Sequence, residues 1–218
     1  MCKKIYQIAI DGPAGSGKST IAKQVAKRLN FQFINTGGMF RCYAIALQNT
    51  NLDDSNEVKK VLEQSKVTLQ EDKLFLNNND VTELANSASI SKLASKIATM
   101  KIVRDTCLVQ QREIASQQSC VMEGRDTTSV VLPNATLKIF LVDNIDVRAK
   151  RRWEQSGKID SLENVKKALI ERDYQDTHRK IAPLIKTPGC KEIDGSYNTI
   201  DQTVNLIIDL FNKEIGNV

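Results

Sequence analysis

The sequence is poor in the residues that build metal clusters and surfaces for stacking bases. It has one histidine, and aromatic residues make up only 5% of it. A histidine-based metal cluster is therefore excluded, a Ser-His-Asp hydrolase lacks its other parts, and a helicase or motor is disfavoured. Five cysteines are scattered without a Cys-x-x-Cys pair. This pattern predicts reduced structural thiols rather than a disulfide framework or a zinc site.

Long apolar runs are also missing. The longest stretch near Lys138 is Ile139-Phe140-Leu141-Val142, far shorter than the roughly 20 residues that a bilayer requires. The N-terminus meets Asp11 too early to hold the apolar part of a signal peptide. We therefore expect no membrane partner and a cytoplasmic protein. A chain of 218 residues is long enough to bury one large core without staples, so a single main domain over 1–218, most simply a monomer, is expected.

Apolar segments alternate with helical patterns along the chain. Residues 5–10 predict a buried strand that ends in the turn Asp11-Gly12-Pro13, a helix begins near Lys18, and 31–34 predict a second strand. Three later segments predict further strands: 120–122, 137–142 and 191–193. This alternation favours an α/β fold with a doubly wound, five-stranded parallel sheet and flanking helices.

One stretch breaks this alternation. Short extended pieces at 67–70, 73–76 and 80–82 are separated by Glu71-Asp72 and by Asn77-Asn78-Asn79. Short strands with turn residues between them are typical of a β-meander. We therefore expect a small antiparallel β insertion at about 66–86.

The segment from Gly12 to Ser19 matches the phosphate-binding pattern G-x-x-x-x-G-K-[ST], directly after the first strand and at the start of the first helix. Its glycines let backbone N–H groups point inward, and the helix N-terminus adds about half a positive charge towards a bound phosphate. Lys18 would reach the β- and γ-phosphates, and the Ser19 hydroxyl would bind Mg²⁺. A glycine-rich turn without function is the alternative.

The phosphate-binding loop (P-loop) by itself indicates only a nucleoside triphosphate. A GTPase would carry Asn-Lys-x-Asp and Asp-x-x-Gly, but Asn212-Lys213 is followed by Glu214-Ile215 and no Asp-x-x-Gly occurs. A small-molecule phosphotransferase remains as the class that these features favour.

Basic residues gather in the last third of the chain. Residues 147–180 hold ten Lys and Arg but six Asp and Glu, which favours an anionic partner or transition state. Arg148, Arg151 and Arg152 fall at i, i+3 and i+4, on one face of a helix. They predict a basic helical lid at about 148–160, with a solvated cationic surface as the alternative.

A second row of charges falls at i, i+4 and i+7 and consists of Arg172, Asp176 and Arg179. Phosphoryl transfer needs two anions held in line while their charge is neutralised, and arginines suit this task. The same spacing also fits an intrahelical ion-pair ladder. The spacing leaves both interpretations open.

Taken in order, these motifs resemble those of bacterial cytidylate kinases, which are P-loop nucleoside monophosphate kinases. The resemblance covers nearly the whole chain and is carried by Gly12 to Thr20, Thr36-Gly37 with Arg41, Gly124-Arg125-Asp126, Val130-Val131-Leu132-Pro133, the Arg148/Arg151/Arg152 helix, and Glu171-Arg172-Asp173 running to Ala182-Pro183-Leu184. The insertion at 66–86 matches that family rather than the shorter adenylate or guanylate kinases. The resemblance implies ATP-dependent phosphorylation of CMP and dCMP, by direct in-line transfer of the γ-phosphoryl group with Mg²⁺ as cofactor.

The resemblance also implies roles for individual residues. The ATP-binding residues would be Gly12, Pro13, Ala14, Gly15, Ser16, Gly17, Lys18, Ser19 and Thr20, with Ser19 on the metal. The catalytic residues would be Lys18, Arg41, Arg125, Arg148, Arg151 and Arg152. Within the CMP site, Arg41, Arg125 and Arg179 would bind the acceptor phosphate, Arg172 and Asp176 the sugar, and Thr36, Ser95, Arg104 and Asp126 the base.

Asp126 suits cytosine because a carboxylate accepts a hydrogen bond from the amino group at N4. Uracil has a carbonyl there, so two acceptors would face each other at a cost of about 1–3 kcal/mol.

Five positions depart from the family pattern. Gly38 and Phe40 stand where a larger residue and a tyrosine are common, Asn35 replaces a frequent aspartate, and Thr128-Ser129 occupies the place of Gly-Thr. If Thr128 needed a positive φ, its branched side chain would be strained.

Two other functions stay open at this point. One is a P-loop kinase that phosphorylates another small acceptor. The other is a nucleotide-dependent RNA-binding protein, which the local excess of basic residues suggests. The sparse aromatic residues and the helix-face spacing of the arginines disfavour the second, so we expect no nucleic-acid partner.

Overall fold

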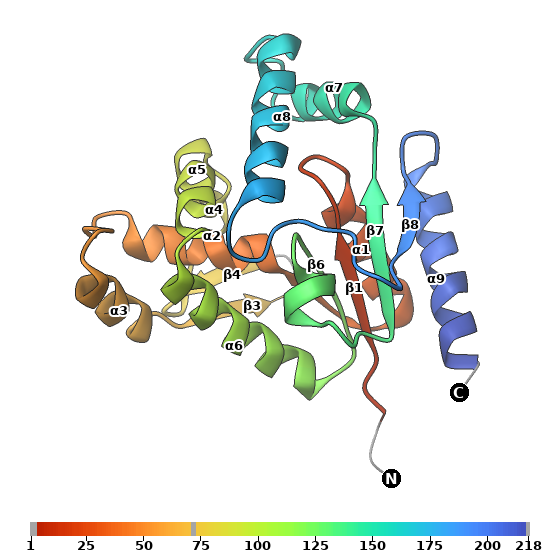
Figure 1. The fold of residues 1–218 in the computed structure, drawn as a ribbon, viewed down its shortest axis with the longest axis horizontal. Helices are drawn as coiled ribbons and strands as arrows, with labels where there is room; N and C mark the ends of the chain where they lie inside the picture. Colours follow the sequence, from red (N-terminus) through yellow and green to blue (C-terminus); the bar gives the residue numbers. More distant parts are fainter. Residues whose placement is uncertain (1–3, 71–72, 217–218) are drawn as a thin grey trace. The chain divides into compact units, whose positions relative to one another are not determined.

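The computed structural model describes residues 4–70 and 73–216 (Figure 1). Their contacts divide the chain into two compact units. The first combines the described residues of Met1–Phe33 with those of Ala115–Val218, and the second runs from Ile34 to Ile114. Among the described residues, no helix is both long and apolar enough to cross a membrane.

The main sheet has five strands in the order β2-β6-β1-β7-β8. Their bounds are β1 (Gln7–Asp11), β2 (Gln32–Asn35), β6 (Cys120–Gly124), β7 (Leu137–Val142) and β8 (Lys191–Asp194). Strand β1 pairs in parallel with β6 and β7, and β7 pairs in parallel with β8; Ile8 lies beside Val121 and Leu137. The predicted α/β class with a five-stranded parallel sheet is confirmed.

One face of this sheet packs on helices α1 (Lys18–Leu29) and α9 (Ile200–Gly216). Alternate side chains of β7 are buried because successive residues of a strand point to opposite faces. They join a core that also contains Ile8, Ile10, Ile21, Val25, Val204 and Ile207. Each such side chain contributes about 1.5–3 kcal/mol when fully buried, so this core anchors the strands whose ends carry the P-loop.

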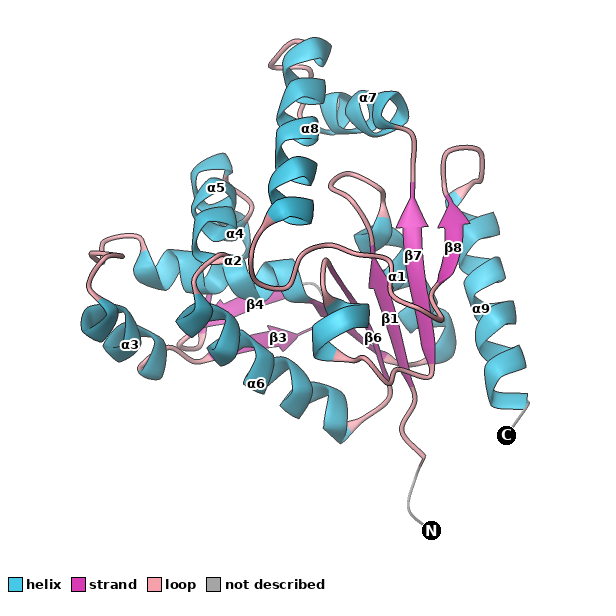
Figure 2. Cartoon of the chain, in the orientation of Figure 1, coloured by secondary structure: helices cyan, strands magenta, loops and turns pink. Residues whose placement is uncertain are grey.

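The carboxyl ends of parallel strands share one edge of a sheet, which is where ligands bind in this class of fold. At this edge β1 continues into the P-loop, and β6 into a short π-helical turn, η1 (Thr127–Val131). Strand β7 leads to helix α7 (Ile145–Gln155), which packs on α8 (Leu162–His178) (Figure 2). Asn144 and Ser161 start these two helices, since each side chain accepts a hydrogen bond from a first-turn N–H group. The lid expected at about 148–160 falls on α7 and the turn after it.

The second unit is built around helix α2 (Thr36–Leu47), which contacts α3 (Ser55–Glu63), α4 (Thr82–Ala85) and α5 (Ala88–Ile97). Helix α6 (Lys101–Gln117) follows α5 in the chain. A three-stranded antiparallel sheet, β3-β4-β5, confirms the predicted β insertion. Its strands are β3 (Val67–Gln70), β4 (Lys73–Leu76) and β5 (Asn79–Asp80).

The last strand of this small sheet is shorter and earlier than the 80–82 that we predicted. The Asp80 carboxylate accepts hydrogen bonds from the N–H and the hydroxyl of Thr82, so the chain turns into α4 there. Asn77 and Asn78 have positive φ angles of 50° and 67°, as a tight hairpin turn requires. The turn predicted at Glu71-Asp72 lies outside the described residues.

Among the residues that the structure describes, the cysteines Cys42, Cys107, Cys120 and Cys190 are not in disulfides. The first three are buried, and their surroundings match the structural role predicted for them. Cys2 lies outside the described residues.

Candidate active site

The P-loop connects β1 to α1 through positions that only glycine suits. A Cβ atom on Gly12 would lie 2.3 Å from the carbonyl oxygen of Leu141 in β7, and Gly15 and Gly17 have φ angles of +74° and +76°. Gly17 precedes α1 and offers no side-chain cap. The N–H groups of the first turn of α1 are therefore available to an anion, as in other phosphate sites at helix N-termini.

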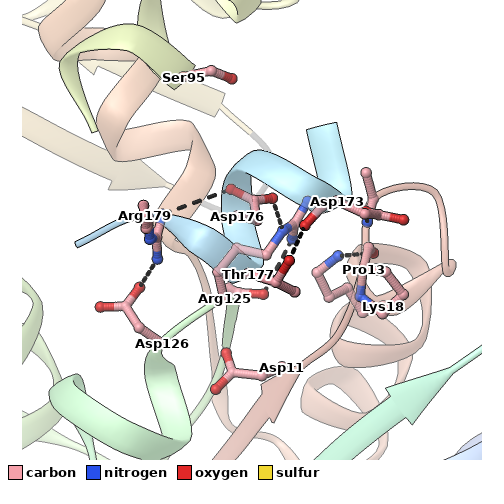
Figure 3. Close-up of polar contacts among 12 residues, drawn as sticks. Asp11, Pro13, Lys18, Ser95, Arg125, Asp126, Asp173, Asp176, Thr177 and Arg179 are labelled. Atoms are coloured by element: carbon pink, nitrogen blue, oxygen red, sulfur yellow. Dashed lines mark hydrogen bonds and ion pairs between the residues drawn. The ribbon is translucent and has the colours of Figure 1, made fainter. Parts of the chain in front are cut away.

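Lys18 is buried at the start of α1, with only 5% of its surface exposed. Its ammonium group donates a 2.8 Å hydrogen bond to the carbonyl of Pro13, inside the loop (Figure 3). The pKa of Lys18 is lowered to about 7, mainly by burial and also by the positive charges of Arg125 and Arg172, although Glu123 and Asp176 act in the opposite direction. A bound phosphate would raise this pKa again, because a nearby negative charge favours the protonated amine.

Ser19, the next residue, donates a 2.7 Å hydrogen bond from its hydroxyl to Oε1 of Glu123. Glu123 is buried near the end of β6. A hydroxyl and a carboxylate supply the oxygen ligands that Mg²⁺ prefers. Glu123 was not among the residues predicted from the sequence, although an acidic residue inside a buried strand is unusual and marks a candidate site.

Asp11, at the end of β1, holds the start of η1. Its carboxylate accepts hydrogen bonds from the N–H groups of Thr127 and Thr128, and from the Thr128 hydroxyl at 2.7 Å. Burial raises the pKa of Asp11, although these bonds act in the opposite direction. Thr128 does not have a positive φ. The threonine at this place is therefore unstrained, and its hydroxyl binds a partner that glycine could not reach.

Two arginine-aspartate contacts link η1 and β6 to the end of α8. Nε of Arg125 donates a 2.7 Å hydrogen bond to Asp176, and Nη2 of Arg179 lies 3.3 Å from Oδ1 of Asp126 (Figure 3). Arg179 also lies 3.7 Å from Asp176. Arg179 comes just after the last residue of α8 and has an extended backbone. The residues therefore connect separate elements and are not a simple ladder along one helix.

The other member of that predicted row, Arg172, is exposed on α8. It acts on the P-loop through its charge, as one of the groups that lower the pKa of Lys18.

The three arginines of α7 differ in their surroundings. Arg148 is buried, with 7% of its surface exposed, and donates hydrogen bonds to Asp173 at 2.5 Å and to the carbonyls of Ala14 and Asp143. Arg151 pairs with the buried carboxylate of Asp143 at 2.9 Å. Arg152 is exposed. Only part of this row is thus a solvated surface.

Arg151 also reaches the P-loop. Its Nη1 atom lies 3.3 Å from the place that a Cβ atom on Gly17 would take. The guanidinium group therefore covers the N-terminus of α1, where phosphate oxygens would add negative charge.

Four predicted site residues lie in the second unit. Thr36 is the first residue of α2 and is buried, and Arg41 follows on the same helix. Asn35 caps this helix, because its side chain accepts a 2.8 Å hydrogen bond from the N–H of Gly38. A Cβ atom on Gly38 would lie 2.8 Å from Leu74 of β4. The glycine thus makes room for Leu74, and Asn35 keeps the cap without a negative charge.

The other two belong to α5 and α6. Arg104 is 8% exposed, donates a 3.0 Å hydrogen bond to the carbonyl of Ala98, and lies over the ring of Phe40 at 5.6 Å. A phenyl ring supports a guanidinium group in this way as well as a tyrosine ring does. The hydroxyl of Ser95 bonds to the carbonyl of Ser91 at 3.2 Å.

Comparisons with known proteins show which family the chain belongs to. The family model "Cytidylate kinase" matches residues 8–213. A cytidylate kinase of Fusobacterium nucleatum subsp. nucleatum is 43% identical over 205 residues, which are 92% of this chain and 94% of that protein. A cytidylate kinase of Thermotoga neapolitana is 40% identical over 216 residues, 96% of this chain and 98% of that one.

A solved structure supports the fold alone. The crystal structure of an uncharacterized protein from Eubacterium ventriosum is 18% identical, with a TM-score of 0.55 over 96% of this chain and 99% of that one. The family match covers nearly all of the described residues, including the P-loop and the arginine-aspartate contacts at its side. The chain belongs to the cytidylate kinase family.

Proposed function

We propose that this protein is a nucleoside monophosphate kinase that transfers the γ-phosphoryl group of ATP to CMP and dCMP. The products are ADP and either CDP or dCDP. The observation that carries the proposal is the pair of contacts Arg125–Asp176 and Arg179–Asp126, in the same compact unit as the P-loop. These contacts place paired arginines and carboxylates beside a phosphate-binding loop, as a binding site for a second nucleotide requires.

On the donor side, the P-loop amides and Lys18 bind the ATP phosphates. Ser19 and Glu123 offer the oxygen atoms that would hold Mg²⁺. The metal, when bound, neutralises negative charge that builds up on the phosphates. Lys18 exchanges its bond to the Pro13 carbonyl for phosphate oxygens, and Arg151, above Gly17, adds positive charge at the same end of α1.

The chemical step needs no protein nucleophile. An oxygen of the acceptor phosphate, already ionised at neutral pH, attacks the γ-phosphorus in line. The bond between that phosphorus and the bridging oxygen of ADP breaks, and the bonding electrons leave with ADP. The protein aligns the two nucleotides and neutralises charge.

On the acceptor side, Arg41, Arg125 and Arg179 bind the phosphate of CMP, and Arg172 and Asp176 bind the sugar. Thr36, Ser95, Arg104 and Asp126 bind the base. The Asp126 carboxylate lies 3.3 Å from Arg179, and its oxygen atoms can accept a hydrogen bond from the base. An accepting carboxylate matches the amino group of cytosine and not the carbonyl of uracil.

The residues at about 148–160 form a lid that excludes water when both nucleotides are bound. The only tryptophan of the chain, Trp153, lies on α7, donates a 2.6 Å hydrogen bond to the carbonyl of Asp160, and has Lys158 over its ring at 4.9 Å. It therefore offers a fluorescence signal for this segment. The monomeric state and the cytoplasmic location expected from the sequence stay predictions.

A kinase for another small acceptor is the nearest competing function. A coupled assay of ADP release, with ATP and Mg²⁺, distinguishes this function from the proposed one. The acceptors compared are CMP, dCMP, UMP, AMP and GMP. We expect kcat/KM to be highest for CMP and dCMP. A higher value for AMP or GMP would replace the proposed acceptor, whereas equal values for CMP and UMP would refute the role of Asp126 and keep the phosphotransfer. The RNA-binding alternative is not favoured by the family match.

A further inference from the structure

Asp173 belongs to the stretch Glu171-Arg172-Asp173 of α8 and has no role in the function proposed above. Its side chain reaches the P-loop, 159 residues earlier in the chain, where Oδ1 accepts a 2.8 Å hydrogen bond from the N–H of Ala14. Figure 3 shows Asp173 beside the loop that carries Pro13 and Lys18. The second carboxylate oxygen accepts a 2.5 Å hydrogen bond from Nη1 of Arg148.

Arg148 completes the contact. The same Nη1 atom donates a 2.8 Å hydrogen bond to the carbonyl of Ala14, and Nε donates a 3.1 Å bond to the carbonyl of Asp143. Both backbone polar groups of Ala14 are thus held by one pair of charged side chains, from α7 and α8. We name this set, Arg148, Asp173 and the backbone of Ala14, the Ala14 clamp.

Apolar packing supports the clamp independently. Ala14, Ala149 and Leu169 are buried together, with Ile145 and Val165 packed against them. The charged pair is also shielded from water, since the side chain of Arg148 is 8% exposed and that of Asp173 is 18% exposed. Hydrogen bonds between ionised groups in such surroundings are stronger than exposed ones.

We propose that Arg148 and Asp173 are positioning residues that hold the P-loop ready for phosphate, and that Arg148 does not itself contact the transferred group. The inward-pointing N–H groups of an empty P-loop repel one another, so the loop needs support from outside. The contacts of Arg148 and Asp173 with Ala14 give the loop this support. A loop that is already ordered binds nucleotide without the entropy cost of ordering. The donor fork of Arg148 already serves three oxygen acceptors of the protein.

The inference rests on the proposed function only in taking ATP and ADP as the ligands of the P-loop. It differs from the catalytic role that the family resemblance implies for Arg148. If Arg148 contacted the transferred phosphate, replacing it would lower kcat, and replacing Asp173 would not lower kcat in the same way. If both residues belong to one clamp, replacing either of them should weaken nucleotide binding to the same extent. Replacing both should then weaken it little further.

The test uses full-length Asp173→Asn, Arg148→Lys and the double variant. Asn keeps an oxygen for the Ala14 N–H but loses the charge that pairs with Arg148; Lys keeps the charge but loses the fork. Asp146→Asn is the matched control, because Asp146 is an exposed acid of α7 that pairs with Lys166. The affinity for Mg·ADP is measured by calorimetry or by Trp153 fluorescence, and kcat and KM for ATP by the coupled assay.

We expect each single variant to raise the Kd for ADP and the KM for ATP by about tenfold, with kcat within about threefold of the wild type. The double variant should be no weaker than the worse single variant, and Asp146→Asn should match the wild type. A folded variant with unchanged ADP affinity would overturn the proposal. So would a fall in kcat alone for Arg148→Lys, which would make Arg148 a phosphate-contacting residue.

Thermal melting shows which variants fold. If Asp173→Asn does not, Arg148→Lys and Asp173→Glu decide between the same outcomes, because Glu keeps the charge but moves the carboxylate away from Ala14. ADP binding needs no acceptor nucleotide. A failure of CMP as substrate would therefore leave this test intact, and unchanged ADP affinity would refute the clamp without affecting the proposed phosphotransfer.

Discussion

Asp176 accepts a 2.7 Å hydrogen bond from Nε of Arg125, and so ties the end of α8 to the loop that follows β6. Both side chains are 17% exposed, which makes the contact stronger than an ion pair on the surface. The same carboxylate lies 3.7 Å from Arg179. Two arginines assigned to the acceptor phosphate are thus held by one aspartate before any anion arrives.

Replacing Lys18 with alanine should abolish turnover and leave the fold intact. The change removes the positive charge aimed at the β- and γ-phosphates, and we expect kcat to fall by at least about 100-fold. The coupled assay measures this, and circular dichroism verifies the fold. Lys27→Ala, which changes an exposed lysine in the last turn of the same helix, is the matched control. Near-normal activity of the Lys18→Ala variant would refute the proposed function.

Replacing Asp126 with asparagine should narrow the preference for CMP over UMP. An amide can donate to the uracil carbonyl, so we expect a loss of about 1–3 kcal/mol of discrimination. The measurement is kcat/KM for CMP and for UMP on the same preparation of the variant. Their ratio cancels any loss of folded protein or any disturbance of Arg179. An unchanged ratio would show that another residue selects the base.

ADP affinity should fall as the pH rises above about 7. Burial lowers the pKa of Lys18 to about 7, so the free protein loses this charge near neutral pH, whereas bound phosphate favours the charged amine. Binding should therefore take up protons, which calorimetry in buffers of different ionisation enthalpy detects. Lys18→Met should remove this pH dependence. Equal dependence in the two proteins would assign it to other groups.

The same pKa has a consequence for stability. Folding lowers the pKa of Lys18 from 10.5 to about 7, so the unfolded chain binds more protons between these values. The free energy of unfolding of the wild type should therefore rise, relative to Lys18→Met, as the pH increases from about 7 towards 10.5. Urea unfolding at pH 7 and at pH 9 measures the difference, and a constant gap would contradict the low pKa.

Replacing Thr128 with glycine should destabilise this protein. The Thr128 hydroxyl bonds to the buried carboxylate of Asp11 at 2.7 Å, and φ is not positive, so glycine brings no relief of strain. We expect a loss of about 1–3 kcal/mol in the free energy of unfolding. Thr128→Ser keeps the hydroxyl and should stay close to the wild type. A glycine variant as stable as the wild type would mean that the bond to Asp11 adds nothing.

Much of the fold could be predicted because its signals are local. The strand Leu137–Val142 was predicted with its observed bounds, since apolar residues and a turn on either side mark a buried strand. The third strand of the small sheet was misplaced because Asp80 bonds to Thr82, and such a competing side-chain bond does not change the apolar pattern.

The site was predicted less completely. Glu123 and Asp11 were missed because their significance lies in partners far along the chain, Ser19 and Thr128. The row of Arg172, Asp176 and Arg179 suggested a single helix face, yet α8 ends at His178 and the backbone of Arg179 is extended.

The sequence by itself determined the P-loop, because glycines, a lysine and a serine at fixed spacing constrain the backbone locally. Tertiary structure decided which charged groups are buried together. Arg148 and Arg152 look alike along the helix, but Arg148 is closed in by Asp173 and Ala14 while Arg152 is exposed. Burial strengthens such contacts and shifts pKa values, and burial depends on packing between distant segments.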